Sequence, residues 1–184
     1  MSEIKLVPFD LTEECLQRCR RLYRESFPKN ERTPGIEHFA KKKNVDYFAV
    51  YDGDSFVGIS YNVRHRDIVY IFYLAVSPEF QGMGYGSKIL SSLKGKYSGC
   101  RLILNIEEVE AGYSNYEQRL KRLKFYEQNG FRKTGLKFKE IGVTYDMLCF
   151  CRQGSEIKRK DYLDLVKDYL GGFLYYTAYK LISI

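Results

Sequence analysis

Three glycines alternate with larger residues in the stretch EFQGMGYGSKIL, which covers residues 79–90. An apolar run predicted to be a strand, residues 68–77, precedes them, and a pattern typical of a helix follows. Free backbone N–H groups and the positive end of the helix dipole collect at such a junction. Glycine lacks the Cβ atom that would hold a ligand away from the backbone. The stretch therefore predicts a turn that binds an anion, above all phosphate. A tight connection with incidental glycines is the alternative.

Two known phosphate-binding motifs do not fit this spacing. A dinucleotide-binding fingerprint requires G-x-G-x-x-G inside a parallel βαβ unit. Gly82, Gly84 and Gly86 instead give G-x-G-x-G, after strands that are predicted to be antiparallel. A Walker loop requires G-x-x-x-x-G-K-[ST], and the sequence contains no such spacing. Both classes of nucleotide site are therefore excluded.

The remaining patterns predict a mixed α+β fold. Strands are expected at residues 4–7, 46–52, 55–64, 68–77, 101–110, 131–138 and 143–151. Helices are expected from residue 12, at 36–42, after the glycines to about 97–99, and at 116–130, with an amphipathic segment at 162–170. The helix after the glycines should bury a stripe of Ile89, Leu90 and Leu93, and the helix at 116–130 has Leu120, Leu123 and Tyr126 or Glu127 at helical spacing. The three strands before the glycines read as an antiparallel meander. The last of them is apolar almost throughout, which indicates a strand covered on both faces in the middle of the sheet.

Composition places limits on the class of protein. The chain has 184 residues and a net charge of +7, with basic residues scattered rather than gathered on one stripe, so nucleic-acid binding is a weaker alternative. No apolar run reaches the ~18 residues of a membrane span, and residues 1–10 lack a signal-peptide core. A cytoplasmic protein without a membrane role is therefore expected. The five cysteines lack histidines at zinc-site spacing, which predicts buried free thiols and no metal.

Two motifs together resemble a known family. The strand segment LAVSPE, residues 74–79, leads into QGMGYG, which reads as Q-x-x-G-x-G, and FYEQNGF stands at residues 125–131. This combination resembles the GNAT superfamily of acyl-CoA-dependent N-acetyltransferases, and the element order matches across residues 4–150. The resemblance implies a central, mostly antiparallel, splayed sheet of about six to seven strands flanked by helices. Residues 1–151 would form this domain, and residues 152–184 a helical and aromatic extension that packs on it or on a partner subunit, so a homodimer is plausible.

The resemblance also implies the cosubstrate acetyl-CoA and its site. Backbone N–H groups of residues 82–87 would hold the pyrophosphate, and the pantetheine arm would pair with the strand edge from Leu74 to Val76. The Val76 N–H would polarise the thioester carbonyl as an oxyanion donor. The expected cofactor-binding residues are Leu74, Ala75, Val76, Gln81, Gly82, Met83, Gly84, Tyr85, Gly86 and Ser87.

Transfer to an amine needs an acid and a base. Tyr126, in FYEQNGF, matches the family tyrosine that reaches the cofactor sulfur as general acid. Many relatives carry a glutamate on the strand before the glycines, but residues 68–73 contain no acid. On the next strand, Glu107 continues the alternation from Asn105, and we expect it to be the base. A carboxylate of pKa ~4.3 needs desolvation or a water relay for that task.

The expected reaction is transfer of an acetyl group to a primary amine by direct attack in a ternary complex. The family builds acceptor recognition in the loop FPKNER, where Glu31 would hold an ammonium group and Arg32 a carboxylate. Arg119 stands where relatives often have an asparagine, and Asn115 lies four residues earlier. A non-catalytic module of the same fold, which binds an acyl-CoA or docks a partner, is the alternative function.

Overall fold

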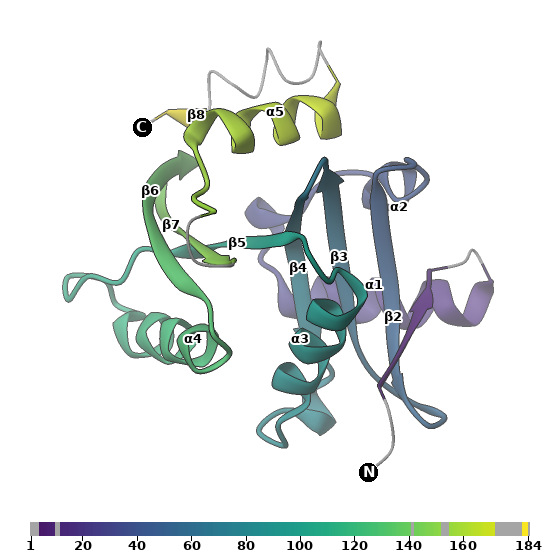
Figure 1. Cartoon of the computed structure of the whole chain (residues 1–184). Helices are drawn as coiled ribbons and strands as arrows, with labels where there is room; N and C mark the ends of the chain where they lie inside the picture. The colour runs from purple at the N-terminus through teal and green to yellow at the C-terminus, as the bar shows by residue number, and fades with distance from the viewer. Residues whose placement is uncertain (1–3, 10–11, 141, 152–154, 172–181, 184) are drawn as a thin grey trace. The chain divides into compact units, whose positions relative to one another are not determined.

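A computed structural model describes residues 4–9, 12–140, 142–151, 155–171 and 182–183 (Figure 1). Its strands are β1 (Ile4–Pro8), β2 (Val45–Asp52), β3 (Ser55–His65), β4 (Ile68–Val76), β5 (Arg101–Glu107), β6 (Arg132–Glu140), β7 (Val143–Phe150) and β8 (Ile182–Ser183). Its helices are α1 (Glu13–Ser26), α2 (Ile36–Phe39), α3 (Tyr85–Lys96), α4 (Tyr116–Gln128) and α5 (Arg159–Leu170), with 3₁₀ turns η1 (Lys29–Glu31) and η2 (Pro78–Phe80).

The strands follow the order β1-β2-β3-β4-β5-β7-β6-β8 in one sheet. Strands β4 and β5 are parallel, and the pairs β1–β2, β2–β3, β5–β7, β6–β7 and β6–β8 are antiparallel. The predicted mixed, mostly antiparallel sheet with flanking helices is thus confirmed. Strand β8 enlarges it beyond the expected number of strands.

The chain divides into two compact units. The first comprises Met1–Arg64 and Ile71–Ser98, and the second comprises His65–Tyr70 and Gly99–Ile184. Helix α5 therefore belongs to the second unit. A division at residue 151, and a second copy packed against the extension, stay predictions.

In the first unit, helices α1 and α3 lie on opposite faces of β2, β3 and β4 (Figure 1). The predicted stripe of α3 is confirmed, because Ile89, Leu90 and Leu93 are fully buried. A Cβ atom on Gly58 of β3 would come within 2.4 Å of the Ala75 carbonyl oxygen of β4. Glycine at this position therefore allows the two strands to approach closely.

In the second unit, β6 and β7 form a curved hairpin beside β5 (Figure 1). The amphipathic pattern of α5 is confirmed, because its apolar side chains are buried: Tyr162, Leu165, Val166 and Tyr169. Helix α4 differs from its predicted pattern. Leu120 and Leu123 are only half-buried, and the buried residue of this helix is Arg119.

Two predicted elements are shorter in the structure. Strand β5 ends at Glu107, and the Glu108 N–H continues the contact with β7 by a single bond to the Thr144 carbonyl. Helix α2 ends at Phe39, because Lys41 and Lys42 bond to carbonyls three residues back, as in a 3₁₀ turn.

The cysteines are free thiols, as predicted, although only two of them are buried, Cys19 and Cys149. The described residues contain no group of three or more His, Cys, Asp or Glu side chains placed to hold a metal ion. No helix formed by these residues has the length and apolar character of a membrane span.

Candidate active site

Gly82 and Gly84 shape the turn between β4 and α3. Their φ angles of +75° and +80° lie in the left-handed region, which residues with a side chain rarely adopt. A Cβ atom at either position would meet no atom within 4 Å. The left-handed backbone therefore favours glycine at both positions, and the space beside the turn is open. Gly84 is the N-cap of α3, where no side chain caps the helix and the first turn has no acidic residue. The helix N-terminus can thus offer N–H groups to an anion.

Side chains of the turn brace its backbone. The Gln81 Nε2 donates to the Val76 carbonyl oxygen at 3.0 Å, and the Tyr85 hydroxyl donates to Asp52 Oδ2 at 2.8 Å. The Phe80 ring meets the Tyr85 ring edge to face, with centroids 5.2 Å apart. These contacts tie the turn to the ends of β4 and β2, so the backbone is held in place before a ligand binds. Between the glycines, the Met83 side chain is 61% exposed.

The edge of β4 that turns away from β3 carries Val76. The Ser77 N–H bonds to the Val57 carbonyl of β3 at 3.0 Å. Because successive residues of a strand point their backbone groups to opposite edges, the Val76 N–H and C=O face the other way. The N–H and C=O groups of Leu74 also face away from β3. Among the described residues, the ladder between β4 and β5 pairs 68–70 with 101–103 and does not extend to this segment.

Glu107, at the end of β5, is held by two arginines of α4. Its Oε1 lies 2.9 Å from Arg119 Nη2, and its Oε2 lies 3.0 Å from Arg122 Nη1. Only 14% of the Glu107 side chain is exposed. Both carboxylate oxygens of Glu107 are therefore held in ion pairs.

Arg119 joins α4 to the end of β5. Its Nε donates to Asn115 Oδ1 at 2.7 Å, and its Nη1 donates to the Glu108 carbonyl oxygen at 2.8 Å. Its guanidinium carbon lies 3.8 Å from the centroid of the Tyr113 ring. All of these partners surround a side chain that is 6% exposed. Arg119 is thus a buried residue that holds the start of α4 against the end of β5.

Tyr126 lies near the end of α4 beside other aromatic rings. Its ring centroid is 5.0 Å from that of Phe125 and 5.7 Å from that of Phe131. Burial raises the pKa of Tyr126 to about 12, and the charge of Arg122 opposes this shift. Within the described part of the chain, no group hydrogen-bonds its hydroxyl. Arg122 therefore lies near both predicted catalytic residues, because it also pairs with Glu107.

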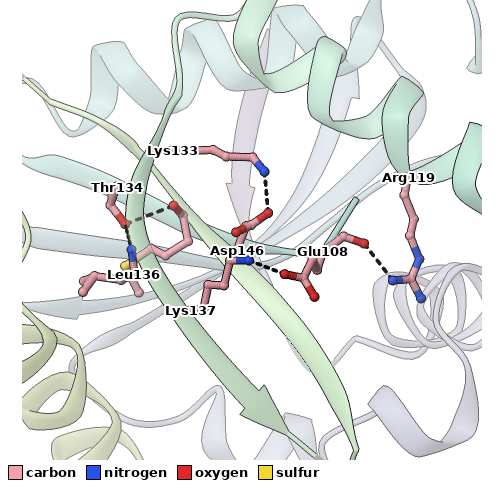
Figure 2. A network of polar contacts seen from close by, with 8 residues as sticks. Glu108, Arg119, Lys133, Thr134, Leu136, Lys137 and Asp146 are labelled. Carbon is pink, nitrogen blue, oxygen red and sulfur yellow. Dashed lines mark hydrogen bonds and ion pairs between the residues drawn. The ribbon is translucent and has the colours of Figure 1, made fainter. Parts of the chain in front are cut away.

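Glu108 does not present a free carboxylate, although it is buried next to Glu107. Figure 2 shows its carboxylate paired with Lys137, while Lys133 Nζ pairs with Asp146 Oδ2 at 2.5 Å. Strand β6 bulges between these two lysines, where Gly135 has a φ of +82°. The bulge places both lysines over the buried carboxylates of β7 and the end of β5. Each acid is thereby neutralised.

The loop that carries Glu31 and Arg32 is tied to the first unit by main-chain contacts. Arg32 Nε donates to the Phe27 carbonyl at 2.6 Å, and its Nη2 donates to the Arg24 carbonyl at 2.8 Å. The Tyr73 hydroxyl of β4 donates to the Glu31 carbonyl at 2.7 Å. Arg32 therefore caps the end of α1. An acceptor role for these two residues stays a prediction.

The predicted cofactor residues, 74–76 and 81–87, all lie in the first unit, and both predicted catalytic residues lie in the second. The structure adds a polar cluster that sequence analysis did not single out. The Tyr162 hydroxyl of α5 accepts from Asn105 Nδ2 at 3.1 Å and donates to Glu140 Oε1 at 3.2 Å. The amphipathic pattern of α5 marked Tyr162 as buried, but nothing in the sequence paired it with residues 57 and 22 positions away.

Comparison with known proteins decides the family. Residues 43–133, which include the glycine turn, match the family model described as the acetyltransferase (GNAT) domain. The chain carries a GNAT domain. The matched residues extend from the start of β2 to the start of β6 and contain both motifs on which the resemblance rests. A comparison with curated protein sequences finds no match.

Solved structures share the fold of this GNAT domain at low sequence identity. A protein from Bacteroides thetaiotaomicron assigned to the GNAT family of acetyltransferases has 16% identity and a TM-score of 0.70, over 94% of this chain and 98% of that one. A Bacillus subtilis acetyltransferase in complex with CoA has 14% identity and a TM-score of 0.59, over 83% of this chain and 99% of that one. An aminoglycoside 6'-N-acetyltransferase complexed with coenzyme A has 15% identity and a TM-score of 0.62, over 83% of this chain and 99% of that one.

Proposed function

We propose that this protein is an N-acetyltransferase that moves an acetyl group from acetyl-CoA to a primary amine by direct attack in a ternary complex. The observation that carries the proposal is the braced turn at Gly82 and Gly84, which leads into an uncapped helix directly after β4. Backbone N–H groups in that arrangement suit a pyrophosphate. Two structural relatives, the Bacillus subtilis acetyltransferase and the aminoglycoside 6'-N-acetyltransferase, bind coenzyme A.

The first unit would bind the cofactor through its backbone. The N–H groups from Gly82 to Ser87 would hold the pyrophosphate, and the edge of β4 at residues 74–76 would pair with the pantetheine arm. The Val76 N–H faces away from β3, so it is placed to donate to a thioester oxygen lying along that edge. An N–H donor at this point would stabilise the oxyanion that develops during attack.

Tyr126 would assist the departing sulfur. Burial keeps its phenol protonated, with a pKa of about 12, whereas a thiol has a pKa of ~8.5. Full transfer of the Tyr126 proton to a free thiolate would therefore be unfavourable. We propose that Tyr126 donates a hydrogen bond as negative charge develops on the sulfur, with the charge of Arg122 favouring this step.

The acceptor must lose a proton before it attacks. An amine of pKa ~10.4 costs roughly 4–5 kcal/mol to deprotonate at pH 7. Glu107 stays a candidate for the base, and both of its carboxylate oxygens lie in ion pairs with arginines of α4. Glu31 and Arg32 stay candidates for holding the acceptor.

One observation favours a second function, a module that binds an acyl-CoA without turnover. The carboxylate expected to act as the base is already held in two ion pairs. In that case the glycine turn would still bind the cofactor, but no amine would be acetylated.

Calorimetric titration with acetyl-CoA, followed by thiol release across a panel of primary amines, tests these alternatives. We expect saturable binding and amine-dependent release of free CoA. Repetition of the titration at higher salt is the control, because a protein of net charge +7 attracts anions without specificity and added salt screens that attraction. Binding without thiol release for any amine would support the non-catalytic module. No binding of acetyl-CoA at millimolar concentration would contradict both functions.

A further inference from the structure

A row of hydrogen-bonded side chains lies between α5 and the strands of the second unit. Tyr162, only 2% exposed, stands at its centre. Its hydroxyl contacts Asn105 of β5, Glu140 of β6 and the hydroxyl of Tyr70 of β4. Three polar partners around one buried hydroxyl use its full hydrogen-bonding capacity of one donor and two acceptor sites.

The chemistry of the partners sets the direction of these bonds. The Asn105 Nδ2 group can only donate, and an ionised Glu140 carboxylate can only accept. The single proton of Tyr162 is therefore directed at Glu140, so the remaining bond runs from the Tyr70 hydroxyl to the Tyr162 oxygen. The O–H groups of Tyr70 and Tyr162 thus point in sequence toward one carboxylate.

Asn105 has an acceptor without a partner at this place. Its Oδ1 is buried and makes no hydrogen bond to any of the described residues. Buried polar atoms are rarely left unpaired, because the loss costs free energy. An N–H donor from a ligand would satisfy it. Tyr70 is the last residue of the β4–β5 ladder and lies four residues before Leu74 on the same strand. The row therefore begins where the pairing of β4 with β5 ends.

Glu140 is the carboxylate at the far end of the row, half-buried at the end of β6. Burial raises its pKa, and the hydrogen bond from Tyr162 opposes this shift. No cationic group of the described residues forms an ion pair with it. Arg159 of α5 instead lies over the Phe138 ring and donates to the Lys137 carbonyl. Strand β8 meets Glu140 through its backbone. Glu140 thus differs from Glu107, both of whose carboxylate oxygens are held in ion pairs.

We propose that Glu140 is the proton acceptor for the transfer reaction, with Tyr70 and Tyr162 as the relay between it and the amine. This inference rests on the proposed function. An N–H bond of the protonated amine breaks, and its proton forms a new O–H bond on Tyr70. The former proton of Tyr70 moves to the Tyr162 oxygen, and that of Tyr162 moves to Glu140 Oε1. Both tyrosines end neutral, and the nitrogen keeps the electron pair that attacks the thioester. Asn105 Oδ1 accepts a second N–H of the amine and orients it.

Proton entry at Tyr70 follows from the bonding of its neighbour. The Tyr162 oxygen already accepts two hydrogen bonds, so an amine proton has no site there. Tyr70 would therefore contact the amine, whereas Tyr162 and Glu140 act through it. Because the overall reaction releases one proton, Glu140 passes the proton to water after each turnover.

The pH dependence of kcat tests the relay in Glu140→Gln and Tyr162→Phe. At pH 7 we expect each variant to lower kcat by about 10²-fold. Each should also lose the acid limb of the profile, which is the fall of kcat at low pH caused by protonation of Glu140. The double variant should be no slower than either single one, because both remove the same path. Glu140→Asp should retain the acid limb. Unchanged acetyl-CoA affinity in each of these variants would show that the variant is folded. Glu156→Gln, at an exposed carboxylate outside the row, is the control and should keep the limb.

The outcomes separate the relay from the proposed function. Wild-type protein that binds acetyl-CoA but acetylates no amine overturns both. Turnover whose acid limb survives in Glu140→Gln, or disappears in Glu107→Gln, overturns the role of Glu140 alone.

A second measurement does not depend on turnover. Because the folded pKa of Glu140 is raised, the folded state binds more protons than the unfolded chain between the unfolded value of ~4.3 and the folded value. The melting temperature of the wild type relative to Glu140→Gln should therefore fall as pH rises through that window. A difference that is constant with pH would contradict a buried, titrating carboxyl.

Discussion

The Arg119 guanidinium lies 2.9 Å from the Glu107 carboxylate, and only 6% and 14% of the two side chains are exposed. The same guanidinium bonds to the side chain of Asn115 and the carbonyl of Glu108. One side chain thus joins the start of α4 to the end of β5. The attachment of this helix depends on buried charge, since its leucines are only half-buried.

Replacement of Arg119 by alanine should therefore destabilise the protein. It would leave the Glu107 carboxylate and the Glu108 carbonyl without their buried partner, and breaking a buried ion pair costs about 3–5 kcal/mol. Urea unfolding would measure the loss. Lys121→Ala, on the exposed side of the same helix, should change stability by less than about 0.5 kcal/mol. Equal effects of the two substitutions would show that the ion pair is not what holds α4.

Tyr126→Phe should lower kcat and leave acetyl-CoA affinity unchanged, because only the hydroxyl that would meet the departing sulfur is removed. The loss expected for a positioned proton donor is about 10²-fold or more. Because the pKa of Tyr126 is about 12, its phenol stays protonated up to pH 10, so wild-type kcat should not fall on the alkaline side below that pH. Tyr116→Phe, at the start of the same helix, is the control. An unchanged kcat would remove Tyr126 from the mechanism.

Gly84→Val should abolish acetyl-CoA binding, since a branched side chain disfavours the left-handed backbone of the turn and would cover its N–H groups. Calorimetry would measure the affinity. Gly99→Val is a matched control, because Gly99 also has a positive φ, +90°, and a Cβ there would meet no atom within 4 Å. Similar loss of binding in both variants would point to general backbone strain. Normal binding in Gly84→Val would contradict the pyrophosphate site.

Tyr73→Phe should loosen the loop that carries Glu31. The Tyr73 hydroxyl donates to the Glu31 carbonyl at 2.7 Å and accepts from the Thr33 N–H at 3.0 Å. Loss of a hydroxyl with such bonds costs about 1 kcal/mol of stability. If the loop recognises the acceptor, KM for the amine should rise while acetyl-CoA affinity stays constant. Tyr51→Phe is the control. An unchanged KM would separate the loop from acceptor recognition.

Local patterns predicted most elements of this fold correctly. Alternation and apolar runs located the strands, and the buried stripe of α3 at Ile89, Leu90 and Leu93 followed from helical spacing. Helix α4 shows where the approach fails. A leucine at helical spacing indicates a core position, but the buried place went to Arg119, because partners on β5 and in the preceding loop could neutralise its charge and satisfy its donors.

The glycine turn was readable from the amino-acid sequence because its physics is local. A left-handed backbone, the missing Cβ atoms and the helix that follows all depend on neighbouring residues, and they are enough to indicate an anion site. The state of each carboxylate could be known only from the folded chain. Glu107 is bound by two arginines, whereas Glu140 accepts a hydrogen bond from a tyrosine and forms no ion pair with any described residue. Burial and charge partners set the proton affinity of a carboxyl group, and both arise when segments distant in sequence come together.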